Sequence, residues 1–189
     1  MEALLTSTAV VALAEIGDKT QLLAIVLATR FKRPLPIILG IFFATLANHF
    51  LAALLGQQVA SLFEGPWFLY VVAASFIVMA AWTLIPDKFE EDEQAPARFG
   101  AFLATLFAFF LVEMGDKTQL ATVALGARFN SVLAVTAGTT LGMMIANVPA
   151  VFFGQQLIRR VPLHVIRWIA AGLFLLIGLL LLAQTAELI

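Results

Sequence analysis

The residues best suited to chemistry in this chain lie in a seven-residue motif that occurs twice. The two copies read Glu15-Ile16-Gly17-Asp18-Lys19-Thr20-Gln21 and Glu113-Met114-Gly115-Asp116-Lys117-Thr118-Gln119. Each copy lies within a long apolar run, where one charged side chain in lipid costs about 2.5–3.5 kcal/mol on insertion scales. The two copies carry six such groups, so we expect these groups to face one another, water or a bound ion. We interpret them as a functional site.

The composition indicates the environment in which this motif lies. Of the 189 residues, 62% are hydrophobic and 12% are charged, which is about half the charged fraction of a typical water-soluble domain. We therefore expect an all-α integral membrane protein in contact with the lipid bilayer. No basic patch indicates binding to nucleic acid. The chain has no cysteine, which excludes disulfides, thiolate metal sites and cysteine nucleophiles.

Six apolar segments have close to the roughly 20 residues that a membrane-spanning helix needs. We place these segments at about 3–29, 36–60, 66–85, 100–126, 131–157 and 163–185. The longest polar stretch, 86–98, is acidic and separates the third segment from the fourth. The sequence therefore predicts six transmembrane helices with one copy of the motif in the first and one in the fourth.

The second half of the chain repeats the first with an offset of 98 residues. Outside the motif, the matches are Arg30-Phe31 with Arg128-Phe129, Gly40 with Gly138, and Gly56-Gln57-Gln58 with Gly154-Gln155-Gln156. A unit of three spanning helices ends on the opposite side of the membrane from its start, so the second copy must be inverted. We predict two inverted three-helix repeats, 1–85 and 99–189, with a binding site near the bilayer midplane where they meet.

Basic residues predict the orientation of the chain in the membrane. Loops on one side hold Arg30, Lys32, Arg33, Lys88, Arg98, Arg159, Arg160 and Arg167. The loops on the other side hold only Arg128. By the positive-inside rule the first side is cytoplasmic, which places both termini outside and the 86–98 linker in the cytoplasm.

The four motif carboxylates suggest the ligand that the site binds. Glu15 and Asp18 are three residues apart and would share one face of a continuous helix, as would Glu113 and Asp116. Two facing copies would bring four carboxylates together, and a hard divalent cation takes oxygen ligands of this kind. We therefore predict that these four residues bind a metal ion.

Other polar residues at the same depth narrow the choice of metal. Asn48 and Asn147 lie near the centres of the second and fifth segments and align with a slip of one residue, so each is a candidate to add an amide oxygen. The only histidines are His49 and His164. We interpret His49 as a structural residue, because the repeat places Val148 or Pro149 opposite it. Without cysteine, Mn²⁺, Ca²⁺ and Mg²⁺ are the candidates rather than Zn²⁺ or Cu⁺.

The remaining motif residues are predicted to support or gate the site. Lys19 follows Glu15 by four residues, the favourable order for an ion pair on a helix, and Lys117 follows Glu113 in the same way. We hypothesise that each lysine pairs with carboxylate in the empty state and gives way when metal binds and displaces protons. Gly17 and Gly115 permit either close helix approach or local unwinding. Threonine and glutamine are expected to form interhelical hydrogen bonds or to ligate, and they are Thr20, Thr118, Gln21 and Gln119.

The doubled Glu-x-Gly-Asp-Lys-Thr motif in a six-segment chain resembles the small cation/proton exchanger family. Its bacterial members include the MneA-type manganese exporters, and its eukaryotic members supply Mn²⁺ and Ca²⁺ to the Golgi. The resemblance covers nearly the whole chain and both motif copies. It implies Mn²⁺ export across a bacterial inner membrane in exchange for protons, with Ca²⁺ as a second candidate. The ion-binding carboxylates would then be Glu15, Asp18, Glu113 and Asp116, and no cofactor is expected beyond the transported ion.

Other interpretations stay open on the sequence alone. An intramembrane acid hydrolase also places Gly-Asp in membrane helices, but it needs two acids of unlike context rather than a duplicated set, so we expect no enzyme. A passive channel would conduct metal without a pH change. A structural salt-bridge network of the carboxylates and lysines is the third alternative. The residues do not rank Mn²⁺ over Ca²⁺, since both are hard ions, and they do not give the oligomeric state.

Overall fold

The chain is helical throughout the part that the structure describes. The computed structural model describes residues 1–63, 65–85, 100–154 and 163–187. Its helices are α1 (Glu2–Glu15), α2 (Lys19–Phe31), α3 (Pro34–Leu62), α4 (Pro66–Thr83), α5 (Gly100–Glu113), α6 (Lys117–Phe129), α7 (Val132–Phe153) and α9 (Leu163–Thr185). The predicted all-α class is confirmed. The predicted linker 86–98 and the end of the fifth predicted segment lie outside the described residues.

Three of these helices, α3, α7 and α9, are long and apolar enough to cross a membrane on their own. They contain 29, 22 and 23 residues, whereas the apolar helices α4 and α5 are shorter. At about 1.5 Å per residue, 22 residues extend over about 33 Å, which matches the hydrocarbon core of a bilayer. The structure thus contains apolar helices of membrane-spanning length.

Each motif interrupts its segment, so the expectation of one continuous helix through the motif is wrong. α1 ends at Glu15 before α2 begins at Lys19, and α5 ends at Glu113 before α6 begins at Lys117. The backbone reverses its sign of φ at Gly17 (+84°) and at Gly115 (+78°). Residues with a Cβ avoid this region, whereas glycine adopts it readily, which explains why a glycine lies at each break. Of the two alternatives for the motif glycines, close helix approach and local unwinding, the structure shows unwinding at both.

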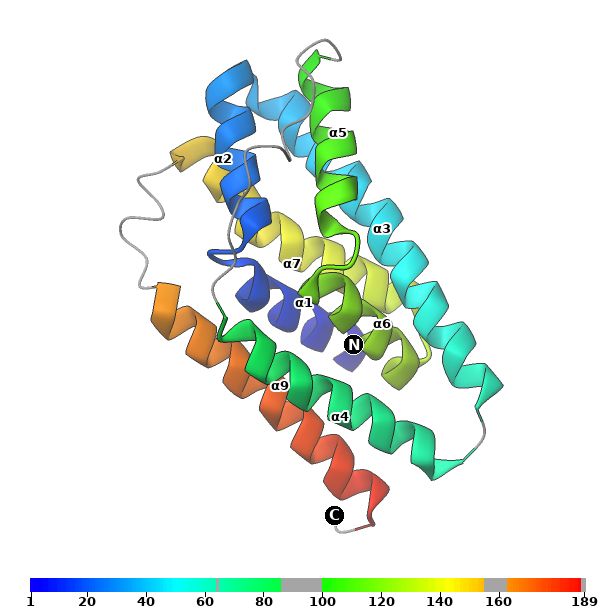
Figure 1. Cartoon of the computed structure of the whole chain (residues 1–189). Coiled ribbons are helices and arrows are strands. Elements are labelled where there is room, and N and C mark those ends of the chain that lie inside the picture. Colours follow the sequence, from blue (N-terminus) through cyan, green and yellow to red (C-terminus); the bar gives the residue numbers. More distant parts are fainter. Residues whose placement is uncertain (64, 86–99, 155–162, 188–189) are drawn as a thin grey trace.

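The helices of each half pack mainly on helices of the other half. α1 and α2 pack on α7, whereas α5 and α6 pack on α3. The two long helices α3 and α7 also contact each other, and α4 and α9 lie side by side as a pair along one face (Figure 1). Because of this exchange of partners, both interrupted helix pairs meet in the middle of the bundle.

Close backbone contacts preserve the 98-residue repeat. A Cβ at Gly40 would lie 2.9 Å from the carbonyl oxygen of Phe102, and one at Gly138 would lie 2.5 Å from that of Leu4. The two glycines differ by 98 residues, and so do the two residues that they contact. The helix ends repeat as well, because Lys32 and Asn130 both adopt left-handed backbone after α2 and α6. The two halves therefore share packing geometry as well as sequence.

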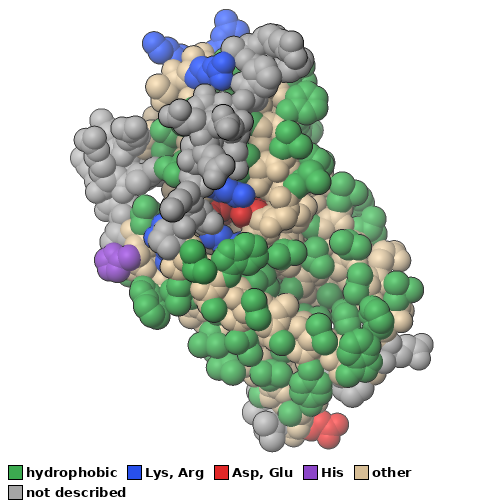
Figure 2. Space-filling view, in the orientation of Figure 1, with side chains coloured by type: hydrophobic (Ala, Val, Ile, Leu, Met, Phe, Trp, Pro, Cys, Tyr) green, Lys and Arg blue, Asp and Glu red, His purple; other side chains and the backbone are tan. Residues whose placement is uncertain are grey.

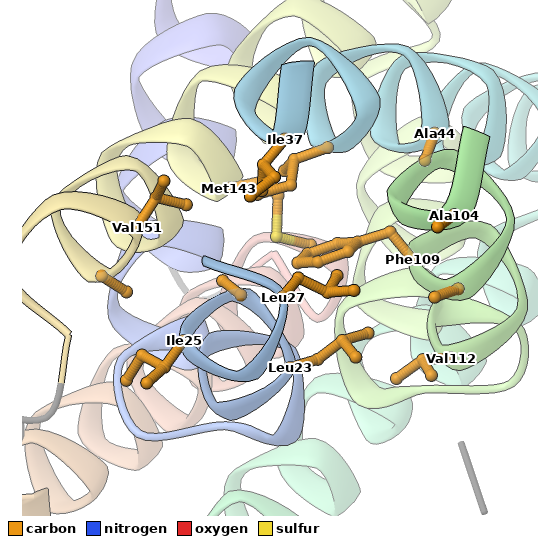
Figure 3. Close-up of a cluster of buried hydrophobic side chains, with 14 of the residues drawn as sticks. Leu23, Ile25, Leu27, Ile37, Ala44, Ala104, Phe109, Val112, Met143 and Val151 are labelled. Carbon is orange, nitrogen blue, oxygen red and sulfur yellow. The ribbon is translucent and has the colours of Figure 1, made fainter. Parts of the chain in front are cut away.

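An apolar core lies between α2, α3, α5 and α7. Phe109 points toward Leu27 and Met143 at its centre, and Ile37 covers it from α3 (Figure 3). A second cluster joins α4, α6 and α9, and its rings Phe76 and Phe174 are 6.3 Å apart. These two clusters pack the helices that flank the motif breaks, and so they fix the positions of both breaks.

The outer surface is mostly apolar, as a lipid-facing surface must be. Figure 2 shows hydrophobic side chains over much of the visible face. Basic side chains gather at the end where α2 gives way to α3 (Figures 1 and 2). In the middle of the same face acidic and basic side chains lie next to each other (Figure 2). Charged side chains thus lie at both ends and at mid-height of this face (Figure 2).

Candidate metal centre

Three of the four predicted carboxylates meet in the centre of the bundle. One carboxylate oxygen from each of Glu15, Glu113 and Asp116 lies within 4.8 Å of the others. Glu15 and Glu113 are completely buried and Asp116 is 3% exposed. Oxygens at this spacing, contributed by both motif copies, form a cluster that can coordinate a cation. The fourth carboxylate, Asp18, is also buried but is not part of this group.

The motif threonines hold one oxygen of each glutamate. Thr20 donates a hydrogen bond to Glu15 Oε2, and Thr118 Oγ1 lies 3.0 Å from Glu113 Oε2. Within the described part of the chain, the other oxygen of each glutamate, Oε1, has no hydrogen-bond partner. Buried polar atoms normally have partners. The glutamates are thus oriented by their own motif while each keeps one oxygen available for a ligand.

The motif lysines connect the two repeats. Lys19 Nζ lies 3.3 Å from Asp116 Oδ1, and Lys117 Nζ lies 3.4 Å from Asp18 Oδ1. The predicted pairing of each lysine with the glutamate of its own motif assumed a continuous helix, and the break at glycine removes that geometry. The ion pairs shown by the structure instead cross from one motif to the aspartate of the other. Each lysine therefore interacts electrostatically with a carboxylate of the opposite repeat.

The motif glutamines stabilise the breaks and tie them to the neighbouring long helix. Gln21 Oε1 accepts a hydrogen bond from Gly17 N at 2.9 Å, and its Nε2 donates to the carbonyl oxygen of Ala146 at 3.0 Å. Gln119 Oε1 accepts from Gly115 N in the same way, and its Nε2 donates to Asn48 Oδ1 at 2.7 Å. The predicted interhelical hydrogen bonding by these glutamines is confirmed.

The structural register shows that Asn48 and Asn147 are not equivalent. The partners of Gln21 and Gln119 are Ala146 and Asn48, which differ by the same 98 residues as the glutamines themselves. Asn147 therefore occupies the position of His49, and the slip of one residue that aligned the two asparagines is wrong. The same packing register at Gly40 and Gly138 leaves no room for a slip between the long helices.

The two asparagines also differ in their hydrogen bonds. Asn48 uses both ends of its amide, accepting from Gln119 and donating Nδ2 to the carbonyl oxygen of Phe110 at 3.3 Å. Asn147 donates Nδ2 to Met143, but its Oδ1 is buried and, among the described residues, accepts no hydrogen bond. Asn147 thus keeps an oxygen available, whereas Asn48 braces the second motif.

Sequence reasoning missed one polar residue at this centre. His49 is completely buried, and its Nε2 lies 3.6 Å from Glu113 Oε2. Neither ring nitrogen has a hydrogen-bond partner within the described residues, and the interpretation of His49 as a structural residue gave no indication that it lies next to Glu113. Alignment at a constant offset of 98 would have paired it with Asn147 and marked both as one position.

Helix ends add a favourable field at the carboxylates. Asp18 is the N-cap residue of α2 and Asp116 is the N-cap residue of α6. The N-terminus of a helix carries a partial positive charge, which stabilises a nearby carboxylate. Each of the two helices begins within its own motif, directly after the motif aspartate. Interrupted membrane helices use such ends to bind ions at mid-depth in secondary transporters.

Comparison with known proteins identifies the class to which this helical, metal-suited centre belongs. A sequence profile described as "Divalent cation/proton antiporter GDT1" matches residues 3–91 and again residues 101–188. These two matches cover nearly the whole chain. The chain therefore belongs to the GDT1 family, a family of transporters. Together with its apolar helices, this membership makes it a multi-pass membrane protein that handles a divalent cation and protons.

Individual relatives support this membership. A Vibrio cholerae protein named "Putative manganese exporter" is 52% identical over 180 residues, covering 95% of this chain and 90% of the relative. "GDT1-like protein sll0615" from Synechocystis is 28% identical over 88% of this chain and 89% of its own length. "GDT1-like protein 5" from Arabidopsis thaliana is 26% identical over 92% of both. The resemblance read from the motifs is confirmed. No solved structure matches the chain significantly.

Proposed function

We propose that this chain exports Mn²⁺ from the cytoplasm in exchange for protons, by alternating access around the carboxylate centre. The ligands are Glu15, Asp18, Glu113 and Asp116 together with the amide oxygen of Asn147. The observation that carries the proposal is the meeting of buried carboxylate oxygens from both motifs within 4.8 Å. The relative that is named as a manganese exporter supports the choice of ion. Ca²⁺ is a second candidate substrate, because it takes the same oxygen ligands.

The charge of the centre supports exchange for protons. Four carboxylates and two lysines leave a formal charge of −2 when all are ionised. One divalent ion neutralises this charge, and so do two protons. Because a buried net charge is unfavourable, the centre changes sides in one of these two neutral forms. Moving an uncompensated divalent ion against 100 mV costs about 4.6 kcal/mol, so two protons entering per metal ion leaving remove that term.

The lysines link metal binding to the two repeats. Each lysine pairs with the aspartate of the opposite repeat. A metal ion that takes up Asp18 or Asp116 as ligand competes directly with that lysine. Binding therefore loosens a connection between the repeats as it fills the centre, which couples occupancy to the motion that opens the other side.

We further propose six membrane spans arranged as two inverted repeats. α1 with α2, and α5 with α6, each form one interrupted span, and α3, α4, α7 and α9 form the others. The family profile that matches once in each half supports the duplication, and an odd number of spans per repeat requires the inversion. The excess of basic residues on one side supports a cytoplasmic 86–98 linker, with both termini outside a bacterial inner membrane.

The proposal is tested in proteoliposomes with a pH-sensitive dye inside. An Mn²⁺ gradient is expected to drive proton flux in the native chain. Asp18→Asn and Asp116→Asn are each expected to abolish this flux, because each removes a ligand and a lysine partner. Glu2→Gln is the matched acid-to-amide control, since the side chain of Glu2 is 75% exposed and Glu2 lies at the opposite end of α1 from Glu15. Full flux in both aspartate variants would refute the proposal, and Mn²⁺ entry without a pH change would indicate a channel.

A further inference from the structure

His49 and Asn147 form a pair of equivalent positions in the two repeats. The constant offset of 98 residues places them at the same depth on α3 and α7, and both are completely buried. They are one of the positions at which the repeated centre differs in chemistry, as the pair Asn48 and Ala146 is another. One repeat supplies an imidazole nitrogen where the other supplies an amide oxygen.

Both residues carry polar atoms that the described part of the chain leaves without hydrogen bonds. These atoms are Nδ1 and Nε2 of His49 and Oδ1 of Asn147. A buried polar atom without a partner costs about 1–3 kcal/mol, so native proteins seldom keep one without a reason. His49 lies next to Glu113 of the carboxylate cluster, and Asn147 holds the equivalent position in the other repeat, which points to a ligand of the site as the partner of these atoms.

The distances agree with a single coordinated ion. His49 Nε2 lies 3.6 Å from Glu113 Oε2, and the three clustered carboxylate oxygens lie within 4.8 Å of one another. Around an octahedral ion with bonds of about 2.1 Å, adjacent ligands are roughly 3 Å apart and opposite ligands roughly 4 Å apart. Small side-chain movements would bring the imidazole nitrogen onto the same ion as Glu113.

We propose that His49 is a nitrogen ligand of the transported ion and sets the preference of the centre for Mn²⁺ over Ca²⁺ and Mg²⁺. The inference rests on the proposed transport function and adds the basis of its selectivity. Carboxylate and amide oxygens suit all three ions, whereas imidazole binds first-row transition metals and contributes little to Ca²⁺ or Mg²⁺. The neutral ring donates one lone pair to the metal, and no bond is made or broken within the protein.

The direct test is pulsed electron paramagnetic resonance of Mn²⁺ bound to the purified chain. Coupling to a directly coordinated ¹⁴N nucleus is expected, and it should change when the chain is labelled with ¹⁵N-histidine. The chain has only one other histidine, so His164→Gln is the matched control and is expected to keep the coupling. His49→Asn is expected to remove it. Bound Mn²⁺ without nitrogen coupling in the native chain would overturn the inference.

Selectivity gives the second test. His49→Asn gives both repeats the same amide ligand, and Mn²⁺ affinity relative to Ca²⁺ is expected to fall at least the roughly tenfold typical of weakened metal sites. The exchanged variant His49→Asn with Asn147→His keeps one nitrogen and one amide oxygen, and it is expected to recover the Mn²⁺ preference. An unchanged ratio in His49→Asn, or equal losses for both ions, would overturn the inference.

The outcomes separate this inference from the proposed function. If the native chain neither binds Mn²⁺ nor exchanges it for protons, the transport proposal itself fails. If Mn²⁺ binds and is exchanged but shows no nitrogen coupling, the transport proposal stands and only the role of His49 is refuted. The spectroscopic test uses the native chain, so it decides the question even where a variant does not fold.

Discussion

The two copies of the motif differ at one residue in seven, yet their surroundings are unlike. A Cβ at Gly17 would lie 2.8 Å from Leu163 Cδ2, whereas none of the described residues comes within 4 Å of a Cβ at Gly115. Ile16 is half-buried, and its counterpart Met114 is 56% exposed. The first break is therefore covered by the start of α9, and the second is open on the corresponding side.

The α4–α9 pair accounts for this difference. α9 packs on α1 and α4 packs on α6, but contacts of similar extent between α4 and α5 or between α9 and α2 are absent among the described residues. The pair thus lies against α1 and α6 rather than against α2 and α5. Because the two repeats have nearly the same motif but are packed differently, the α4–α9 pair could also lie against α2 and α5. The structure shows one of these two arrangements. Under the proposed function, transport exchanges the surroundings of the two motifs.

The crossed ion pairs offer the largest effect with which to test this comparison. The side chains of Lys117 and Asp18 are 6% and 1% exposed, whereas those of Lys19 and Asp116 are 20% and 3% exposed. Removing one partner of a buried pair leaves an uncompensated charge and costs about 3–5 kcal/mol. Lys117→Met is therefore expected to destabilise the chain by this amount, and Lys19→Met by less because its side chain is more exposed. Thermal unfolding in detergent measures both.

Removal of the orphaned charge provides the control for this prediction. Adding Asp18→Asn to Lys117→Met replaces the carboxylate that has lost its lysine with a neutral amide, and it is expected to recover much of the lost stability. Equal destabilisation by the two lysine variants would show that the covered and open sides do not differ in solvation. The comparison between the motifs would then rest on packing alone.

The motif glycines give an intermediate effect. Alanine in left-handed backbone costs roughly 1–2 kcal/mol, and this strain is expected in both Gly17→Ala and Gly115→Ala. The new methyl group at position 17 must also displace Leu163, so Gly17→Ala is expected to lose more stability than Gly115→Ala. Adding Leu163→Ala should remove the extra loss but not the shared strain. Unfolding temperatures of the four variants provide the measurement.

A different ranking of these variants would break the comparison. If Gly115→Ala were the more destabilised, α9 would not cover the first motif in the state that dominates in detergent. If Leu163→Ala rescued Gly115→Ala to the same extent as Gly17→Ala, the rescue would be unrelated to contact. Either result would show that the unequal packing of the motifs is not a property of the resting chain.

Much of this fold follows from composition and repetition. Apolar segments of membrane-spanning length predicted the helices, and the offset of 98 residues predicted which elements are equivalent. Charged groups in apolar segments also identified the centre, because their placement in lipid is unfavourable without partners. The break at each motif was anticipated only as local unwinding at Gly17 and Gly115. Periodicity cannot place such a break, since both flanking helices keep apolar patterns.

The partners of the polar residues could not be predicted from local spacing. Lys19 and Glu15 have the separation of a helical ion pair, but the backbone between them is not helical, so the structure joins Lys19 to Asp116. The prediction also aligned Asn48 with Asn147 because both are asparagines, although the constant offset of 98 residues pairs Asn48 with Ala146. Tertiary packing across the repeats decides both contacts. A constant offset of 98 residues would have aligned His49 with Asn147 and so marked His49 as a candidate site residue. No local sequence pattern predicts the ion pairs that the lysines form across the repeats.

Substitution of the motif glutamines is expected to give the smallest change in stability, and it tests the role of Asn48. Gln119 donates to the side chain of Asn48, whereas Gln21 donates to the backbone of Ala146. Asn48→Ala and Gln119→Ala remove the same hydrogen bond, so their destabilisations should overlap by about 0.5–1.5 kcal/mol in a double-mutant cycle. Asn48→Ala with Gln21→Ala is the control and is expected to be additive. If Asn48→Ala instead lowers Mn²⁺ affinity while Gln119→Ala does not, Asn48 is a ligand, and the difference between the two motifs is smaller than their hydrogen bonds indicate.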